Sequence, residues 1–143
     1  MITSIRHAGL VVNNLEKSLN FWVDILGFKL VKKMVESGPK IDSILGLKNV
    51  MVTTAKLSDN NGNLIELLKF HSHQSKKKWE GKPYSTGLTH LALLVDNFDE
   101  LVSKFSELGF KLKNKPVISD DNKVKVVYIE TLEGLLLEIV ETL

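Results

Sequence analysis

IRHAGLVV at residues 5–12 recurs as LTHLALLV at residues 88–95, with the histidine and most apolar positions retained. The likeness continues as LGFKL at residues 26–30 and 108–112, and as GNLIEL at residues 62–67 against GLLLEI at residues 134–139. Motifs that return in the same order mark an internal repeat, and a repeat of this length determines the architecture. The sequence therefore predicts one structural unit written twice.

Each copy has the pattern of a strand, a helix and further strands. The first helix is expected over residues 14–26, with Leu19 and Trp22 on its apolar face and Gly27 as its stop, and the second runs from Asn97 to Gly109. β-rich segments follow each helix, at residues 30–35, 50–57 and 63–70 in the first copy and at residues 111–113, 124–131 and 135–140 in the second. The predicted fold class is α+β, with two βαβββ modules that form a half-barrel trough.

The modules are expected at residues 1–70 and 88–143, joined by a linker at residues 71–87, and together they make one domain. The linker is polar and irregular, which is typical of a connecting segment. The first copy is longer than the second between Gly27 and Gly62. We expect the additional residues within 36–48, as a turn and a short amphipathic helix, and a loop elaborated in one copy often shapes a ligand site.

Four ionisable residues lie in the apolar strand-like runs: His7, Glu66, His90 and Glu138. A carboxylate is costly to bury unless a positive partner compensates its charge. A single buried histidine or glutamate is as readily a structural group, but here two His/Glu pairs fall at equivalent places of a repeat. Strand alternation places His7 on the same face as Gly9, so the side chains are expected to point inward. The pattern predicts a metal site.

Two imidazoles and two carboxylates suit a six-coordinate divalent ion with two positions left for water or a chelating substrate. Such an ion can polarise a carbonyl and stabilise the enediolate that forms when a neighbouring C–H bond loses its proton. A ligand carboxylate is within reach of a chelated substrate and can act as the base. Glu138 is the first candidate for this catalytic role and Glu66 the second, with a small molecule as the substrate.

Composition excludes several other classes. The absence of cysteine excludes disulfides, thiolate ligands and cysteine nucleophiles. A net charge of +2, with Arg6 as the single arginine among 19 basic residues, does not favour a nucleic-acid partner. No apolar run is long enough to cross a bilayer and the N-terminus lacks the pattern of a signal peptide, so no membrane partner and a cytoplasmic location are expected.

The motifs together resemble the vicinal oxygen chelate superfamily, which includes glyoxalase I, methylmalonyl-CoA epimerase, extradiol dioxygenases, and the bleomycin and fosfomycin resistance proteins. The resemblance is carried by residues 5–15, 21–22, 26–28, 65–67, 87–92 and 137–139. It implies paired βαβββ modules, a divalent metal ion (Zn, Ni, Co, Mn or Fe) between them, and a homodimer.

Glyoxalase I, or lactoylglutathione lyase, uses His or Gln, then Glu, His and Glu, and this chain matches that pattern with His7, Glu66, His90 and Glu138. The resemblance implies that Glu138, with Glu66, transfers the proton. Those enzymes hold glutathione with arginines, of which this chain has one. The expected activity is therefore a glyoxalase I-type lyase or isomerase acting on a small oxygenated substrate. The alternatives are an acyl thioester epimerase resembling methylmalonyl-CoA epimerase and a non-enzymatic drug- or metabolite-binding resistance protein.

Overall fold

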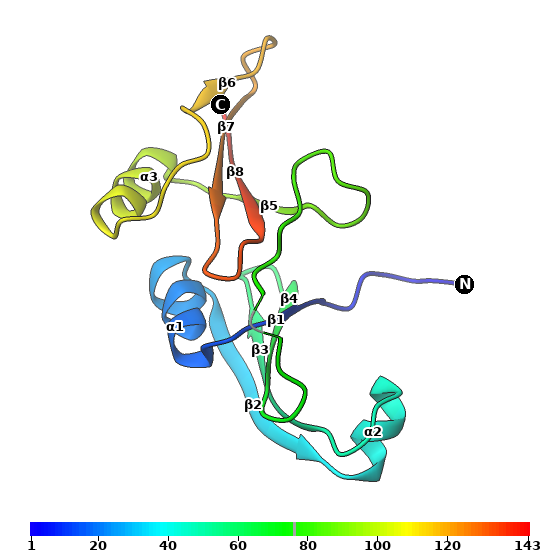
Figure 1. The fold of residues 1–143 in the computed structure, drawn as a ribbon. Helices are drawn as coiled ribbons and strands as arrows, with labels where there is room; N and C mark the ends of the chain where they lie inside the picture. Colours follow the sequence, from blue (N-terminus) through cyan, green and yellow to red (C-terminus); the bar gives the residue numbers. More distant parts are fainter. Residues whose placement is uncertain (76) are drawn as a thin grey trace. The chain divides into compact units, whose positions relative to one another are not determined.

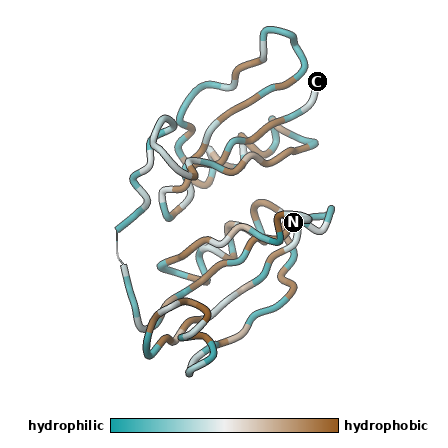
Figure 2. Tube along the Cα trace, turned by 90° about the vertical axis from the view of Figure 1, so that its right-hand side faces the viewer, coloured by the Kyte–Doolittle hydropathy of each residue, from teal (hydrophilic) through white to brown (hydrophobic). Residues whose placement is uncertain are grey.

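A computed structural model describes residues 1–75 and 77–143, and Lys76, in the expected linker, lies outside the described residues. The chain divides into two compact units, Met1–Lys77 and Lys78–Leu143 (Figure 1). In each unit the hydrophobic stretches follow the strands and the helical segment, while many turns are hydrophilic (Figure 2). No helix in the described part of the chain is long and apolar enough to span a membrane.

The first unit is a four-stranded mixed sheet with helical segments. Its elements are β1 (Ala8–Val11), α1 (Leu15–Leu19), η1 (Asn20–Ile25), β2 (Lys29–Ser37), α2 (Pro39–Leu45), β3 (Met51–Ser58) and β4 (Leu64–Phe70). The strand order is β1-β4-β3-β2, in which β1 runs parallel to β4 and the other pairs are antiparallel. This order confirms the predicted βαβββ module, and α2 confirms the short helix expected within residues 36–48.

The helix of the first unit starts at an asparagine cap. The Asn14 side chain accepts a hydrogen bond from the backbone N–H of Lys17 over 3.0 Å, which satisfies one of the donors left free at a helix start. The second half of this helix, η1, is a π-helix, and it places Phe21 and Trp22 in the core, where the Trp22 ring packs edge-to-face on Phe21 and on Phe28. Gly27, at φ 80°, ends the helix as predicted.

The second unit repeats this arrangement. Its elements are β5 (His90–Leu94), α3 (Phe98–Glu107), β6 (Val117–Ile118), β7 (Val124–Glu130) and β8 (Leu136–Thr142). The strand order is β5-β8-β7-β6, with β5 parallel to β8. Phe98 and Phe105 from α3 are fully buried, as are Ile129, Leu137 and Ile139 from the sheet. The two units therefore share one topology, as the repeat predicts.

The prediction of a strand at residues 111–113 is wrong. Leu112 forms only an isolated bridge to Ile129, and the edge strand β6 lies further along the chain. The pairing is interrupted between them because the side chain of Asn114 accepts the N–H of Tyr128 over 2.9 Å, where a strand would offer a backbone carbonyl. Pro116 follows, and a proline has no N–H to give to a ladder. The strand resumes at Val117.

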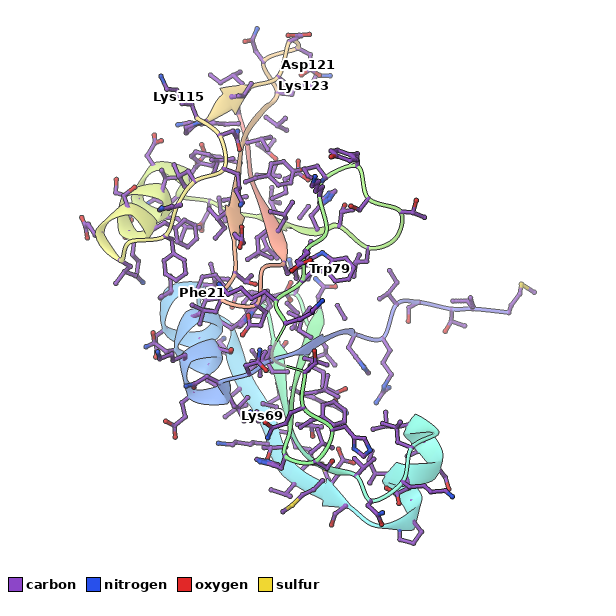
Figure 3. All side chains as sticks on the ribbon, in the orientation of Figure 1. Phe21, Lys69, Trp79, Lys115, Asp121 and Lys123 are labelled. Carbon is purple, nitrogen blue, oxygen red and sulfur yellow. The ribbon has the colours of Figure 1, made fainter. Side chains whose placement is uncertain are left out.

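The start of the second unit is tied to the turn between β7 and β8. Trp79, labelled in Figure 3, donates its backbone N–H to the carbonyl oxygen of Glu133 over 2.8 Å. Gly134 has φ 90°, and a Cβ placed on it would lie 2.5 Å from the backbone oxygen of Trp79. Glycine is therefore required here both by backbone conformation and by the close approach of the chain.

Candidate metal and substrate site

His7 and Glu66 meet in the first unit. His7 directly precedes β1, and the parallel register pairs Gly9 of β1 with Glu66 of β4. Because side chains alternate along a strand, His7, Gly9 and Glu66 share one face, as the sequence predicts. Nε2 of His7 lies 3.2 Å from Oε2 of Glu66, and the two side chains are 29% and 15% exposed. We call this face, which carries the glutamate, the ligand face of the sheet.

His90 and Glu138 form the equivalent pair in the second unit. His90 begins β5, and Ala92 of β5 pairs with Glu138 of β8. Nε2 of His90 lies 3.3 Å from Oε2 of Glu138. Each unit thus brings together one histidine and one glutamate in matching geometry. Within either unit, the described residues contain no group of three or more His, Asp or Glu side chains placed to hold a metal ion.

The spacing and chemistry of each pair fit two ligands of one ion. Ligand atoms bound at about 2.0–2.2 Å and separated by angles of roughly 90–110° lie about 2.8–3.6 Å apart. The Nε2 to Oε2 distances of 3.2 and 3.3 Å fall within this range. An imidazole nitrogen and a carboxylate oxygen are also the donors that a divalent transition metal accepts in an open site. That the two pairs share a single ion stays a prediction.

The two histidines differ in what holds their rings. Oγ1 of Thr89 lies 3.0 Å from Nδ1 of His90, and the His90 ring packs edge-to-face on Tyr128 at 5.5 Å. A contact at Nδ1 of a histidine fixes the direction in which its Nε2 points. Nδ1 of His7, in contrast, is buried and has no hydrogen-bond partner among the described residues. The imidazole of the second unit is therefore the more firmly oriented.

The glutamates have different neighbours across the sheet. Lys56 of β3 is the cross-strand partner of Glu66, and its Nζ lies 3.6 Å from Oε1 of that carboxylate. Tyr128 of β7 is the cross-strand partner of Glu138. Burial raises the pKa of Tyr128, and the charge of Glu138 and a hydrogen bond with its carboxylate raise the same pKa further. One carboxylate therefore faces a cation and the other a phenol.

These neighbours were not anticipated from the sequence. Both precede their glutamate by the same distance along the chain, since β3–β4 and β7–β8 are hairpins of the same register. Facing positions of a hairpin lie close enough for their side chains to interact. The signal was therefore present in the repeat: Lys56 and Tyr128 are the residues that a hairpin alignment places beside Glu66 and Glu138.

The helix α2 covers the far end of the ligand face of the first sheet. Ile41 of α2 packs with Val50 and Val52, and the partly buried Leu68 and Phe70 pack against them. Between this cluster and Glu66, Oγ1 of Thr54 donates a hydrogen bond to Glu36 over 3.1 Å. The inserted segment therefore adds an apolar boundary on the same face as the His7 and Glu66 pair.

Sequence comparison shows that this chain resembles known proteins over most of its length. The model of the Glyoxalase/Bleomycin resistance protein/Dioxygenase superfamily matches residues 4–139. A probable lactoylglutathione lyase of Synechocystis sp. is 28% identical over 137 residues, which cover 95% of this chain and 93% of that protein. The protein YwkD of Bacillus subtilis is 28% identical over 123 residues, covering 84% and 81%.

Two solved structures show the same fold. A glyoxalase family protein from Bacillus cereus superposes with a TM-score of 0.90 at 23% identity, over 100% of this chain and 96% of that one. The fosfomycin resistance protein FosX of Listeria monocytogenes, in complex with Mn(II) and sulfate, superposes with a TM-score of 0.67 at 18% identity, over 100% and 95%. Since the family model spans nearly the whole sequence, the chain belongs to the Glyoxalase/Bleomycin resistance protein/Dioxygenase superfamily.

Proposed function

We propose that this protein is a metal-dependent lyase or isomerase of the glyoxalase I type, which moves a proton next to a carbonyl group of a small oxygenated substrate. The observation that carries the proposal is the pair of equivalent His/Glu contacts, at 3.2 and 3.3 Å, in two units of one topology. Both contacts have the spacing of two ligands on one ion. The same two donor types recur at equivalent positions of both units, which supports a shared role in binding an ion.

His7, Glu66, His90 and Glu138 would hold the ion, which is a divalent metal such as Zn, Ni, Co, Mn or Fe. When bound, it would polarise the carbonyl of the substrate and stabilise the negative charge that develops on its oxygen. The structural neighbour FosX was solved in complex with Mn(II), which supports divalent metal binding on this fold.

The surroundings of the two glutamates favour Glu138 as the base. Oε1 of Glu66 already faces the ammonium of Lys56 at 3.6 Å, and Oε2 faces His7. At Glu138 the cross-strand neighbour is Tyr128, which is uncharged in the protonated state that its raised pKa favours. Glu66 would therefore remain a ligand while Glu138 accepts the proton from the substrate carbon and returns it to the neighbouring position.

The test combines metal analysis with proton exchange. Purified protein is assayed for bound metal, and uptake of solvent deuterium into a panel of 2-oxo compounds and acyl thioesters is followed by NMR. The wild type should retain a divalent metal and exchange at least one class of substrate. Glu138→Gln should lower the exchange rate by about 100-fold or more, since general bases contribute that much.

Glu107→Gln is the matched control, because this exposed glutamate at the end of α3 undergoes the same change of charge. It should leave both metal content and exchange unchanged. A wild type that binds no metal contradicts the proposal. Tight ligand binding without exchange, unaffected by Glu138→Gln, would instead assign the protein to sequestration of a drug or metabolite.

A further inference from the structure

Two lysines stand side by side on the ligand face of the first sheet. The register pairs Lys32 of β2 with Lys56 of β3, and Lys56 in turn with Glu66 of β4. The row ends at Gly9 of β1, which has no side chain. A register shift between Leu30 and Lys32 directly precedes this row, and such irregularities redirect side chains. One row across the sheet thus carries two cations and one anion.

This arrangement leaves positive charge unmatched. Like charges directly opposite each other on neighbouring strands destabilise a sheet. Glu66 turns Oε2 toward His7, and the other oxygen lies 3.6 Å from Nζ of Lys56, which is beyond hydrogen-bond length. The part of the chain that the structure describes gives the Lys56 ammonium no hydrogen bond and gives Lys32 no ion pair. When Glu66 serves as a metal ligand, it compensates the two lysines even less.

The fold does not require this pair of cations. In the second unit the same topology forms with Tyr128 at the position that corresponds to Lys56. Opposite Tyr128 at the edge of the second sheet lies Lys113, which donates its backbone N–H to the carbonyl oxygen of Tyr128 and whose ammonium forms an ion pair with Glu130. The edge lysine of the second sheet is therefore compensated by a carboxylate, whereas Lys32 has no ion pair in the described part of the first unit. A cation pair present in one copy of a duplicated sheet indicates a role in binding rather than in folding.

We propose that Lys56 and Lys32 form an oxyanion subsite for the substrate. The ligand class is a small molecule that carries a carboxylate, phosphonate or phosphate group next to the oxygens that chelate the metal. Lys56, at 32% exposure and beside Glu66, would contact the anion directly, and Lys32 on the exposed edge strand would add its charge. This inference rests on the proposed function, because it places the subsite next to the His7 and Glu66 ligands.

The experiment measures the binding of defined probes by titration calorimetry. Oxalate supplies a carboxylate, phosphonoformate supplies a phosphonate, and inorganic phosphate is the anion alone. Acetohydroxamic acid is a chelator without a further anionic group. Each probe is titrated into the wild-type full chain, with and without Mn(II), and into Lys56→Met and Lys32→Met. Lys33→Met is the matched control, because Lys33 pairs with Ala55 and lies on the opposite face of β2.

Lys56→Met should weaken the binding of oxalate or phosphonoformate about tenfold or more, which is the loss of one charge-assisted hydrogen bond. Lys32→Met should weaken it less, and the affinity of the wild type should fall with added salt. Acetohydroxamic acid should bind equally to all variants, and Lys33→Met should behave as the wild type. Whichever anion depends most on Lys56 identifies the group that the substrate carries.

Failure of this inference is distinguishable from failure of the proposed function. If Mn(II) binds and Lys56→Met weakens all probes equally, or none, the oxyanion subsite is wrong while the metal site stands. If Mn(II) does not bind but the anions bind and depend on Lys56, the subsite stands and the proposed function is wrong. If the wild type binds no anion in either state, the subsite is wrong.

Discussion

Lys56 and Tyr128 occupy the same place in two copies of one hairpin, since each is the cross-strand partner of the glutamate on its ligand face. The repeat therefore preserves the carboxylate and changes its neighbour. A cation lies beside Glu66, whereas a phenol beside Glu138 donates a hydrogen bond to that carboxylate. The two halves of the proposed site are alike in ligands and unlike in chemistry.

Tyr128→Phe tests the role of this phenol. The variant keeps the ring that packs on His90 and loses the hydroxyl that orients Glu138. Metal affinity or proton-exchange rate should fall by roughly tenfold, as is usual when a group that holds a metal ligand is removed. Competition with a chromophoric chelator measures the affinity. Tyr84→Phe is the control, because Tyr84 is 80% exposed, and an equal effect of both variants would exclude a positioning role for Tyr128.

His90→Ala tests whether the histidines are ligands or structural groups. The His90 side chain is 37% exposed, so its removal should change the melting temperature of the metal-free protein little. Metal affinity should fall by more than about tenfold, because one of four proposed ligands is lost. His73→Ala, an exposed histidine near the end of the first unit, is the control. A large loss of stability with unchanged metal binding would assign His90 a structural role.

Asp59 should make the stability of the first unit depend on pH. Its carboxylate accepts hydrogen bonds from the Asn63 side chain over 2.7 Å and from the backbone N–H groups of Asn63 and Asn61. The hydrogen bond from the Asn63 side chain is the largest cause that lowers the pKa of Asp59 below 3.8. A carboxyl whose pKa is lowered by folding stabilises the native state above its unfolded pKa, and this contribution is lost as the pH falls through the folded pKa.

Asp59→Ala should accordingly lower the free energy of unfolding at pH 7 by about 1 kcal/mol, a value discounted for the partial exposure of the group. The difference from wild type should shrink below about pH 4, as the carboxyl of the wild type takes up its proton. Urea unfolding at several pH values measures this trend. Asp120→Asn, at an exposed position, should show no such trend. If the difference in unfolding free energy between Asp59→Ala and wild type did not change with pH, the charge of Asp59 would not be its cause.

Gly134→Ala separates backbone strain from steric contact. Gly134 and Gly62 have φ of 90° and 84°, but only at Gly134 would a Cβ meet another atom, the backbone oxygen of Trp79 at 2.5 Å. Both alanine variants should lose about 1–2 kcal/mol from the strained backbone. Gly134→Ala should lose more, because Trp79 has to move and its hydrogen bond to Glu133 weakens. Equal losses of unfolding free energy for the two variants, measured by denaturant unfolding, would show that the chain at Trp79 moves aside without cost.

The duplicated motifs were sufficient to predict the fold. Repeated strand and helix patterns specify two sheets of one order, because each copy has the same connections to make. They also placed His7 on the face of Gly9, and the register with Glu66 bears this out. The strand at residues 111–113 was predicted wrongly, since apolar alternation says nothing of an Asn114 side chain that takes the place of a backbone acceptor.

The surroundings of the two His/Glu pairs could not be predicted in the same way. Periodicity assigns a residue to a face of a strand, but the partner across the sheet depends on the register that a turn imposes. Lys56 and Lys32 meet only because β2, β3 and β4 are aligned as the structure shows. The π-helical turn at Trp22 likewise has no simple sequence signal, because its pattern of apolar residues also fits an α-helix.

The lengths of the turns within the β3–β4 and β7–β8 hairpins determine which face of the sheet each glutamate occupies. Residues 59–63 and 131–135 are five-residue connections of the same length, each with a glycine at its fourth position. A shift of one residue in a strand turns every side chain to the opposite face. An insertion of one or three residues that shifts the register of β4 or β8 would thus turn the glutamate to the opposite face of the sheet. An insertion of two residues would keep it on the ligand face. Related sequences should therefore favour insertions of an even number of residues in these two turns.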